Sequence, residues 1–224
     1  MEKQKIAVIL SGCGALDGSE IHEATLTLLA LDRANLAYHC LAPNMPQTRV
    51  MNTLTQEISP TTTRYVLEES ARIARGNIQD IGKANATEYA GVIVIGGYGA
   101  ALNLCNYGKD KKNYSVQTDV SNFIRTMIAT KKPAGFICIA PVLIPKLYPA
   151  GVTTTIGNDA SVAAHLEQLG AIHVNCIASK CIVDDTHRVI STPAYMLAHS
   201  IKEVAQGIEC LVSAMVDFLH VTGE

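Results

Sequence analysis

The sequence has little charge of either sign and no long hydrophobic run near its start. Only 17% of its 224 residues are charged, and 18 Lys and Arg against 20 Asp and Glu give a formal net charge of -2. A basic footprint for nucleic acid is therefore missing, and we expect no nucleic-acid partner. The first apolar run, Ile6 to Leu10, has five residues, whereas a secretory hydrophobic region needs about 7–15 and a membrane-spanning helix about 20. We expect a cytoplasmic protein with no membrane partner.

What the sequence does contain is enough apolar material for a core. Apolar residues make up 48% of the chain, which excludes a mainly disordered protein. We find no linker-like segment, internal repeat or low-complexity stretch, so we expect one domain over residues 1–224. The seven cysteines are an odd number in a chain without a secretory signal. This favours free thiols in a reducing compartment over a disulfide framework.

Short apolar runs alternate with longer amphipathic stretches along the chain. Such alternation is typical of parallel strands joined by crossover helices, so we predict a three-layer α/β/α sandwich with a mostly parallel central sheet. The stretch 43–60 looks irregular, and the residues around 184–187 look like a hairpin turn. The expected strands are 6–10, 37–42, 91–95, 134–137, 152–156 and 172–176, and the expected helices are 20–33, 62–75, 116–130, 140–147, 162–169 and 201–219. Because ligands bind at the carboxyl ends of such strands, we look for a site in the loops 11–19, 96–99 and 138–141.

The first of these loops is rich in glycine. Gly12, Gly14 and Gly18 resemble a dinucleotide fingerprint, but the last glycine is one position late and residues 41–44 contain no acid for a ribose. We therefore disfavour nucleotide binding. Two alternatives remain: a turn whose glycines adopt positive φ, or a loop that delivers Glu20 to a site at the start of a helix. His22, beside it, fits a helix surface better than the role of a catalytic base.

Cys138 stands at the most specific local pattern. The apolar strand 134–137 runs directly into it, and Pro141 suits the first turn of a following helix. This is the layout of a nucleophile elbow, in which the N–H groups of the new helix would favour the thiolate and lower the thiol pKa. A buried core cysteine is an equally good reading of the local pattern. Gly96 and Gly97 end another strand, either as a plain turn or as backbone donors for an oxyanion.

The other cysteines have weaker settings. Cys13 and Cys105 lie in loops that could border the same cleft. The spacing of the cysteines and histidines along the chain fits no zinc motif, so we expect no metal site. The remaining four are expected to be core or surface residues: Cys40, Cys176, Cys181 and Cys210.

Five separated motifs, in order along the whole chain, resemble those of the ThiJ/PfpI superfamily. They are residues 10–14, 17–24, 96–104, 135–141 and 192–197. The resemblance is strongest to the ElbB-like branch of glyoxalase-like isoprenoid biosynthesis proteins. It implies a class I glutamine-amidotransferase-like (flavodoxin-like) fold, and it also implies a homodimer.

The resemblance also implies roles for individual residues. Cys138 matches the nucleophile, Glu20 the acid that hydrogen-bonds its sulfur, and Gly97 and Ile139 the oxyanion donors, with Gly96 beside them. Protease-like members carry histidine where this chain has Ile139. A peptide amine needs a general acid to leave, so we expect neither peptidase nor glutaminase activity.

The expected function is a glyoxalase III-like lyase without a cofactor. Cys138 would attack glyoxal or methylglyoxal, a 2-oxoaldehyde, and a hemithioacetal would be converted to the 2-hydroxy acid, with Glu20 moving the proton. Two alternatives stay open. One is a protein deglycase acting on glycated adducts. The other is a non-enzymatic redox sensor or accessory protein of isoprenoid metabolism, since an acidic thiol is readily oxidised.

Overall fold

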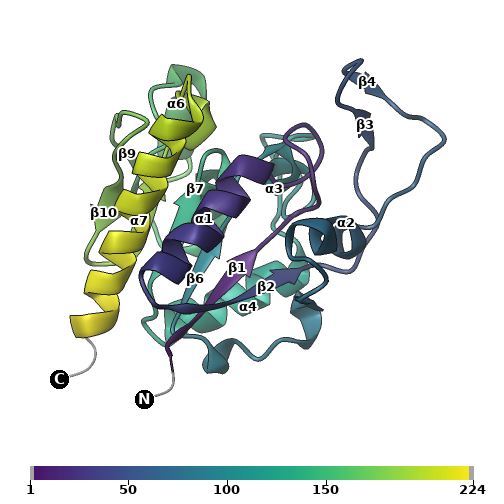
Figure 1. Cartoon of the computed structure of the whole chain (residues 1–224). Coiled ribbons are helices and arrows are strands. Elements are labelled where there is room, and N and C mark those ends of the chain that lie inside the picture. The colour runs from purple at the N-terminus through teal and green to yellow at the C-terminus, as the bar shows by residue number, and fades with distance from the viewer. Residues whose placement is uncertain (1–2, 222–224) are drawn as a thin grey trace.

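The computed structural model describes residues 3–221, which are built around a seven-stranded sheet (Figure 1). The strand order is β10-β11-β7-β6-β1-β2-β5. All neighbours are parallel except β10 and β11, which form the expected hairpin. The mostly parallel sheet predicted from the sequence is therefore confirmed. The strands are β1 (Lys5–Ile9), β2 (Ala37–Ala42), β5 (Ile78–Asp80), β6 (Gly91–Val94), β7 (Ala134–Ile137), β10 (Ile182–Asp184) and β11 (Val189–Thr192).

Helices cover both faces of the sheet, which gives the three layers. α1 (Ile21–Arg33) and α7 (Ile201–Val221) lie side by side on one face, with α2 (Val66–Ile73) next to α1, and α4 (Thr118–Ala129) lies on the opposite face (Figure 1). Every residue of β6, β7 and β11 is buried. Strands covered on both faces read as continuous apolar runs, which is why β6 and β7 were visible in the sequence.

The C-terminal half also contains smaller elements. β8 (Thr153–Thr154) and β9 (Ile172–His173) pair in a separate two-stranded sheet beside α6 (Ala160–Gln168). They are shorter than the strands expected at 152–156 and 172–176. The remaining short helices are α3 (Tyr98–Leu102), α5 (Ile144–Leu147) and the 3-10 turns η1 (Ile81–Lys83), η2 (Ala86–Glu88), η3 (Ala140–Leu143) and η4 (Ala194–Met196).

The segment expected to be irregular contains a small hairpin. β3 (Met51–Asn52) pairs with β4 (Glu57–Ile58), and the hairpin projects away from the body of the molecule (Figure 1). Leu54, in its turn, is 93% exposed. The hairpin strands have two residues each, too few for an alternating pattern to show in the sequence.

One pair of cysteines forms a disulfide, so the expectation that every cysteine is a free thiol was wrong. Cys181, just before β10, forms a disulfide with Cys210 on α7, and their Cα atoms are 5.9 Å apart. The two positions are 29 residues apart in sequence, so only the packing of α7 against the β10–β11 edge brings them together. The other five cysteines, Cys138 among them, are free.

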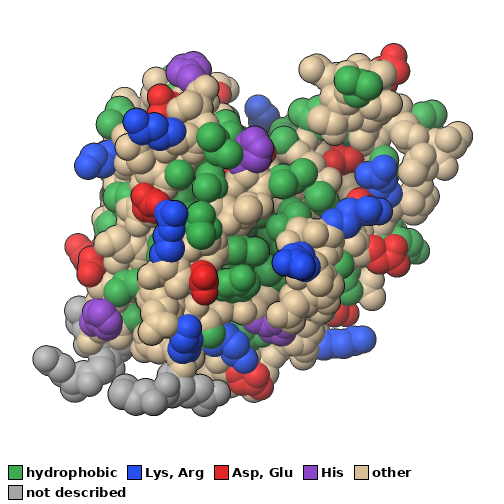
Figure 2. All heavy atoms as spheres, viewed as in Figure 1, with side chains coloured by type: hydrophobic (Ala, Val, Ile, Leu, Met, Phe, Trp, Pro, Cys, Tyr) green, Lys and Arg blue, Asp and Glu red, His purple; other side chains and the backbone are tan. Residues whose placement is uncertain are grey.

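The surface in Figure 2 carries basic and acidic side chains mixed together, without a field of one sign. Within residues 3–221, no helix combines the length and apolar character needed to cross a membrane. The cytoplasmic location stays a prediction. Residues 1–2 and 222–224 of the expected domain lie outside the described part of the chain.

Candidate active site

The three loops predicted to form a site meet at the carboxyl edge of the sheet. The Glu20 N–H donates to the Gly96 carbonyl at 3.0 Å, which joins the first loop to the second. The Gly99 N–H donates to the Gly18 carbonyl at 2.9 Å. A side chain at Gly96 would collide with the Cβ of Cys138, so the second and third loops are in direct contact. The expected convergence is confirmed.

Cys138 occupies a strained turn directly after β7. Its φ is 62°, in the left-handed region that residues other than glycine rarely adopt. The turn is held because the Cys138 N–H donates to the Thr192 carbonyl at the end of β11, at 2.9 Å. The residue is only 7% exposed. A residue at the edge of a sheet whose strained backbone is held by surrounding contacts is typical of a nucleophile elbow.

Two backbone N–H groups point at the Cys138 sulfur. They belong to Gly97 and Ile139, and both act to lower the thiol pKa. Gly97 can adopt its φ of 90° because it has no side chain, and a Cβ there would collide with backbone atoms of Gly18 and Glu20. The two residues proposed as oxyanion donors are therefore both beside the sulfur.

The acid beside the sulfur is Glu23, and this corrects the assignment of Glu20. The Glu23 carboxyl lies beside the Cys138 side chain and is fully buried. Glu20 instead caps α1, because its Oε2 accepts the Glu23 N–H at 2.7 Å. Both acids lie in the same motif, three positions apart. Spacing alone could not tell which of them turns inward, because the answer depends on where α1 begins.

The electrostatics of this pair follow mainly from burial. Burial raises the pKa of Glu23 to about 8, and the nearby Glu20 carboxylate adds to the rise. The N–H groups of Tyr195 and Gly96 and the Cys138 thiol oppose it. Burial also raises the pKa of the Cys138 thiol, and a charged Glu23 raises it further. The expected lowering of the thiol pKa is therefore outweighed by burial.

Two further residues complete the site, and one of them was missed from the sequence. The Tyr195 N–H donates to Glu23 Oε1 at 3.3 Å. Its hydroxyl forms a 2.8 Å hydrogen bond with Nδ1 of His22, which is exposed on α1 as expected. Tyr195 lies within the motif 192–197, which was the available signal, but no spacing rule connects that segment to α1.

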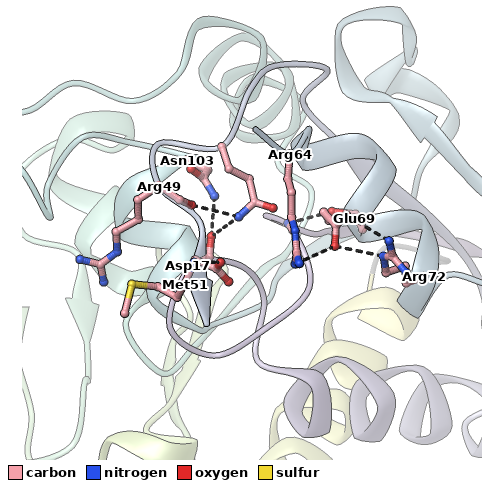
Figure 3. Close-up of polar contacts among 10 residues, drawn as sticks. Asp17, Arg49, Met51, Arg64, Glu69, Arg72 and Asn103 are labelled. Atoms are coloured by element: carbon pink, nitrogen blue, oxygen red, sulfur yellow. Dashed lines mark hydrogen bonds and ion pairs between the residues drawn. The ribbon is translucent and has the colours of Figure 1, made fainter. Parts of the chain in front are cut away.

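The glycine loop is held by hydrogen bonds from the buried side-chain amide of Asn103, which lies next to Asp17 (Figure 3). Asn103 Nδ2 donates to the carbonyls of Ser11 and Asp17, both at 2.9 Å, and Asn103 Oδ1 accepts the Thr48 N–H at 2.9 Å. The Asp17 carboxylate accepts the Met51 N–H at 2.7 Å. The projecting hairpin is thus hydrogen-bonded to the loop that leads into α1, the helix that carries Glu23.

Cys13 and Cys105 have separate surroundings from Cys138. Burial raises the pKa of Cys105 to about 12, and its thiol donates to the Ala100 carbonyl at 3.4 Å. Burial raises the pKa of Cys13 as well, with a further contribution from Glu69. Glu69 is itself ion-paired with Arg64 and Arg72 (Figure 3). In the described part of the chain, no cluster of three or more His, Cys, Asp or Glu side chains has the arrangement of a metal site.

The fold and the site together define an amidotransferase-like α/β protein with a cysteine on a strand-to-helix turn. No family model matches the chain. The ES1 protein homolog, mitochondrial, of Rattus norvegicus is 36% identical over 96% of this chain and 84% of its own. A crystal structure from Ehrlichia chaffeensis, an isoprenoid biosynthesis protein with amidotransferase-like domain, has a TM-score of 0.89 and 39% identity over 96% of this chain and 99% of its own.

The chain belongs to the amidotransferase-like family of these ES1 and isoprenoid biosynthesis proteins. This confirms the resemblance drawn from the five motifs. Glyoxalase III of Candida albicans shares the fold, with a TM-score of 0.60 and 10% identity over 97% of this chain and 96% of its own. At that identity the likeness concerns the fold alone.

Proposed function

We propose that this protein converts a small 2-oxoaldehyde, glyoxal or methylglyoxal, to the corresponding 2-hydroxy acid without a cofactor. The observation that carries the proposal is the pairing of the Cys138 sulfur with the buried Glu23 carboxyl, beside two backbone N–H groups. A nucleophile, a proton carrier and oxyanion donors are the groups that this reaction needs.

The first step is addition of the thiol to the aldehyde. Because burial keeps the thiol neutral, its proton has to leave as the sulfur attacks, and the Glu23 carboxylate is in position to accept it. A base with a pKa of about 8 is well matched to work near neutral pH. The aldehyde oxygen becomes negative as the C–S bond forms, and the N–H groups of Gly97 and Ile139 stabilise it before it takes up a proton.

The second step moves one proton between adjacent carbons. Glu23 removes the C–H proton of the hemithioacetal carbon, which gives an enediol, and returns a proton to the neighbouring carbon. The product is a thioester of the 2-hydroxy acid on Cys138. Water hydrolyses the thioester, releases the acid and restores the thiol, so the overall reaction adds one water and needs no external oxidant.

The residue after Cys138 supports an aldehyde over an amide substrate. Ile139 has no group that could protonate an amine as it leaves, which peptide and glutamine hydrolysis require. Hemithioacetal formation breaks no bond to a poor leaving group. The chemistry therefore fits a site whose acid–base group is a single carboxyl.

The proposal is tested by supplying glyoxal to the purified protein and following glycolate by chromatography. We expect turnover in the wild type and in the control Cys176→Ser, whose cysteine lies outside the site. Cys138→Ser should lose at least about 100-fold, because a hydroxyl is a much poorer nucleophile than a thiol. Equal activity in Cys138→Ser and the wild type would refute the proposal.

The same preparations separate the two alternatives. Addition of oxygen to Cys138 under mild peroxide, seen by intact mass, with no turnover would favour a redox sensor. A deglycase would act on preformed glycated peptides at the same rate with or without an aldehyde scavenger. A glyoxalase would lose that activity when the scavenger removes the free aldehyde.

A further inference from the structure

The Glu23 carboxyl contacts groups from two elements other than its own helix. The Cys138 thiol reaches it from the turn after β7, and the Tyr195 N–H reaches it from η4. The Tyr195 N–H donates to Oε1 at 3.3 Å. The other oxygen, Oε2, makes no hydrogen bond of regular geometry and lies against Gly96. The position of the carboxyl therefore depends on how firmly η4 is kept against α1.

A second bond connects the same two elements. The Tyr195 hydroxyl and His22 Nδ1 are 2.8 Å apart, and the two rings lie at a tilt of 47° with centroids 5.9 Å apart. His22 directly precedes Glu23 on α1. The residue before Tyr195, Ala194, has a φ of 44°, a left-handed conformation that has to be held by its surroundings. The hydrogen bond between the His22 and Tyr195 side chains connects this segment to α1.

We propose that Tyr195 is a positioning residue for Glu23, and that His22 and Tyr195 form a clasp that keeps the carboxyl against the Cys138 sulfur. The clasp acts through geometry, because the hydroxyl–imidazole bond fixes the peptide N–H that donates to Glu23. This inference rests on the proposed role of the Glu23–Cys138 pair. It goes beyond that role by adding two residues that do not touch the reacting sulfur.

The clasp has a consequence for the thiol that can be measured without any substrate. The Tyr195 N–H stabilises negative charge on the Glu23–Cys138 pair, wherever the shared proton sits. If the clasp opens, that stabilisation weakens, and the pair loses its proton only at higher pH. Because only part of one hydrogen bond to a charged group would be lost, we expect an upward shift of about half a pH unit.

The experiment is the rate of alkylation of Cys138 by iodoacetamide between pH 5 and 10, read on the Cys138 peptide by mass spectrometry. Tyr195→Phe removes the hydroxyl and keeps the N–H, and His22→Ala removes its partner. Each should slow alkylation about threefold at pH 7, the equivalent of half a pH unit. The double variant should be no slower than either single one, because both break the same bond.

Two further variants serve as controls. His22→Asn keeps an acceptor near the position of Nδ1 and should restore the wild-type profile. Tyr38→Phe removes a hydroxyl from an exposed tyrosine on β2, away from the site, and should leave the profile unchanged. His22 is exposed, so its substitution tests the clasp even if Tyr195→Phe does not fold.

An unchanged profile in His22→Ala, or additive effects in the double variant, would overturn the clasp. Alkylation needs no aldehyde, so this result is independent of glyoxal turnover. A wild type without turnover whose alkylation profile still shifts in His22→Ala would refute the proposed function and leave the clasp intact. Normal turnover of glyoxal together with an unchanged alkylation profile in His22→Ala would support the proposed function and refute the clasp.

Discussion

Glu23, in the first turn of α1, lies beside Cys138, at the end of β7, and both side chains are buried. Neither residue is unusual for its own element, since one is an acid near a helix N-terminus and the other a cysteine after a strand. Their functional character comes from the shared burial, which raises the pKa of both groups.

The first prediction concerns stability against pH. The ordinary pKa of a glutamate is 4.5, and in the folded protein that of Glu23 is about 8. The folded state therefore keeps a proton that the unfolded chain releases, so stability falls as the pH rises from about 4.5 to 8. At about 1.4 kcal/mol per pKa unit, this group can cost the folded state up to about 5 kcal/mol above pH 8.

Glu23→Gln removes this dependence because the amide does not ionise. In urea unfolding at pH 5, 7 and 9, the variant should gain stability relative to the wild type as the pH rises. Glu209→Gln, which changes an exposed carboxyl, should show no comparable trend. A difference between Glu23→Gln and wild type that is the same at all three pH values would contradict the raised pKa.

The second prediction separates the charge of Glu20 from its capping role. Glu20→Gln keeps an oxygen that can accept the Glu23 N–H, so the helix cap should survive. It removes the negative charge that raises the pKa of Glu23. Glu23 should then ionise at lower pH, and the rising limb of the pH–rate profile for glyoxal should move down by about one pH unit. A shift to higher pH would show that Glu20 acts in another way.

The third prediction concerns the space between the acid and the sulfur. A methyl group at Gly96 would collide with Glu23 Oε2 and with the Cβ of Cys138. Gly96→Ala should therefore lose activity and about 1–3 kcal/mol of stability through overpacking. Gly82→Ala is a suitable control, because its methyl group would meet only the Asp119 side chain, at 3.2 Å, which has to move by only a few tenths of an ångström. Wild-type kinetics and thermal stability in Gly96→Ala would contradict the close packing.

The fourth prediction concerns the support of the glycine loop. Asn103→Ala removes two buried hydrogen bonds and one part-buried hydrogen bond, and it leaves the carbonyls of Ser11 and Asp17 without this donor. We expect a loss of about 2–4 kcal/mol in thermal unfolding and faster proteolysis of residues 43–65. Gln47→Ala, whose half-buried amide also donates to Asp17 O, should cost about 1 kcal/mol. Equal losses in the two variants would argue against Asn103 as the main anchor.

The sequence predicted the sheet well because its central strands are buried on both faces. β7 was located at its observed bounds, and the elbow after it was visible from the apolar run, Cys138 and Pro141. The edge strand β5 and the hairpin of β3 and β4 were missed, because two or three residues carry no periodic signal. Local pattern therefore located the nucleophile, and it was much less informative about short, exposed strands.

The identity of the acid needed the three-dimensional structure. Glu20 and Glu23 are one helical turn apart, and the first of them sits at the helix cap. Because the first helical residue is Ile21, Glu23 turns toward the sheet and Glu20 remains half-exposed. The Cys181–Cys210 pair was missed for a related reason, since only the packing of α7 brings the two cysteines together.

The most direct test compares the two acids in one assay. Glycolate formation from glyoxal would be measured at pH 7.5 for the wild type, Glu23→Gln and Glu20→Gln. If Glu23 carries the proton, Glu23→Gln should lose at least about 100-fold, the usual contribution of a general base, while Glu20→Gln should stay within about tenfold of the wild type. Full activity in Glu23→Gln with loss in Glu20→Gln would contradict the account and return the proton transfer to Glu20.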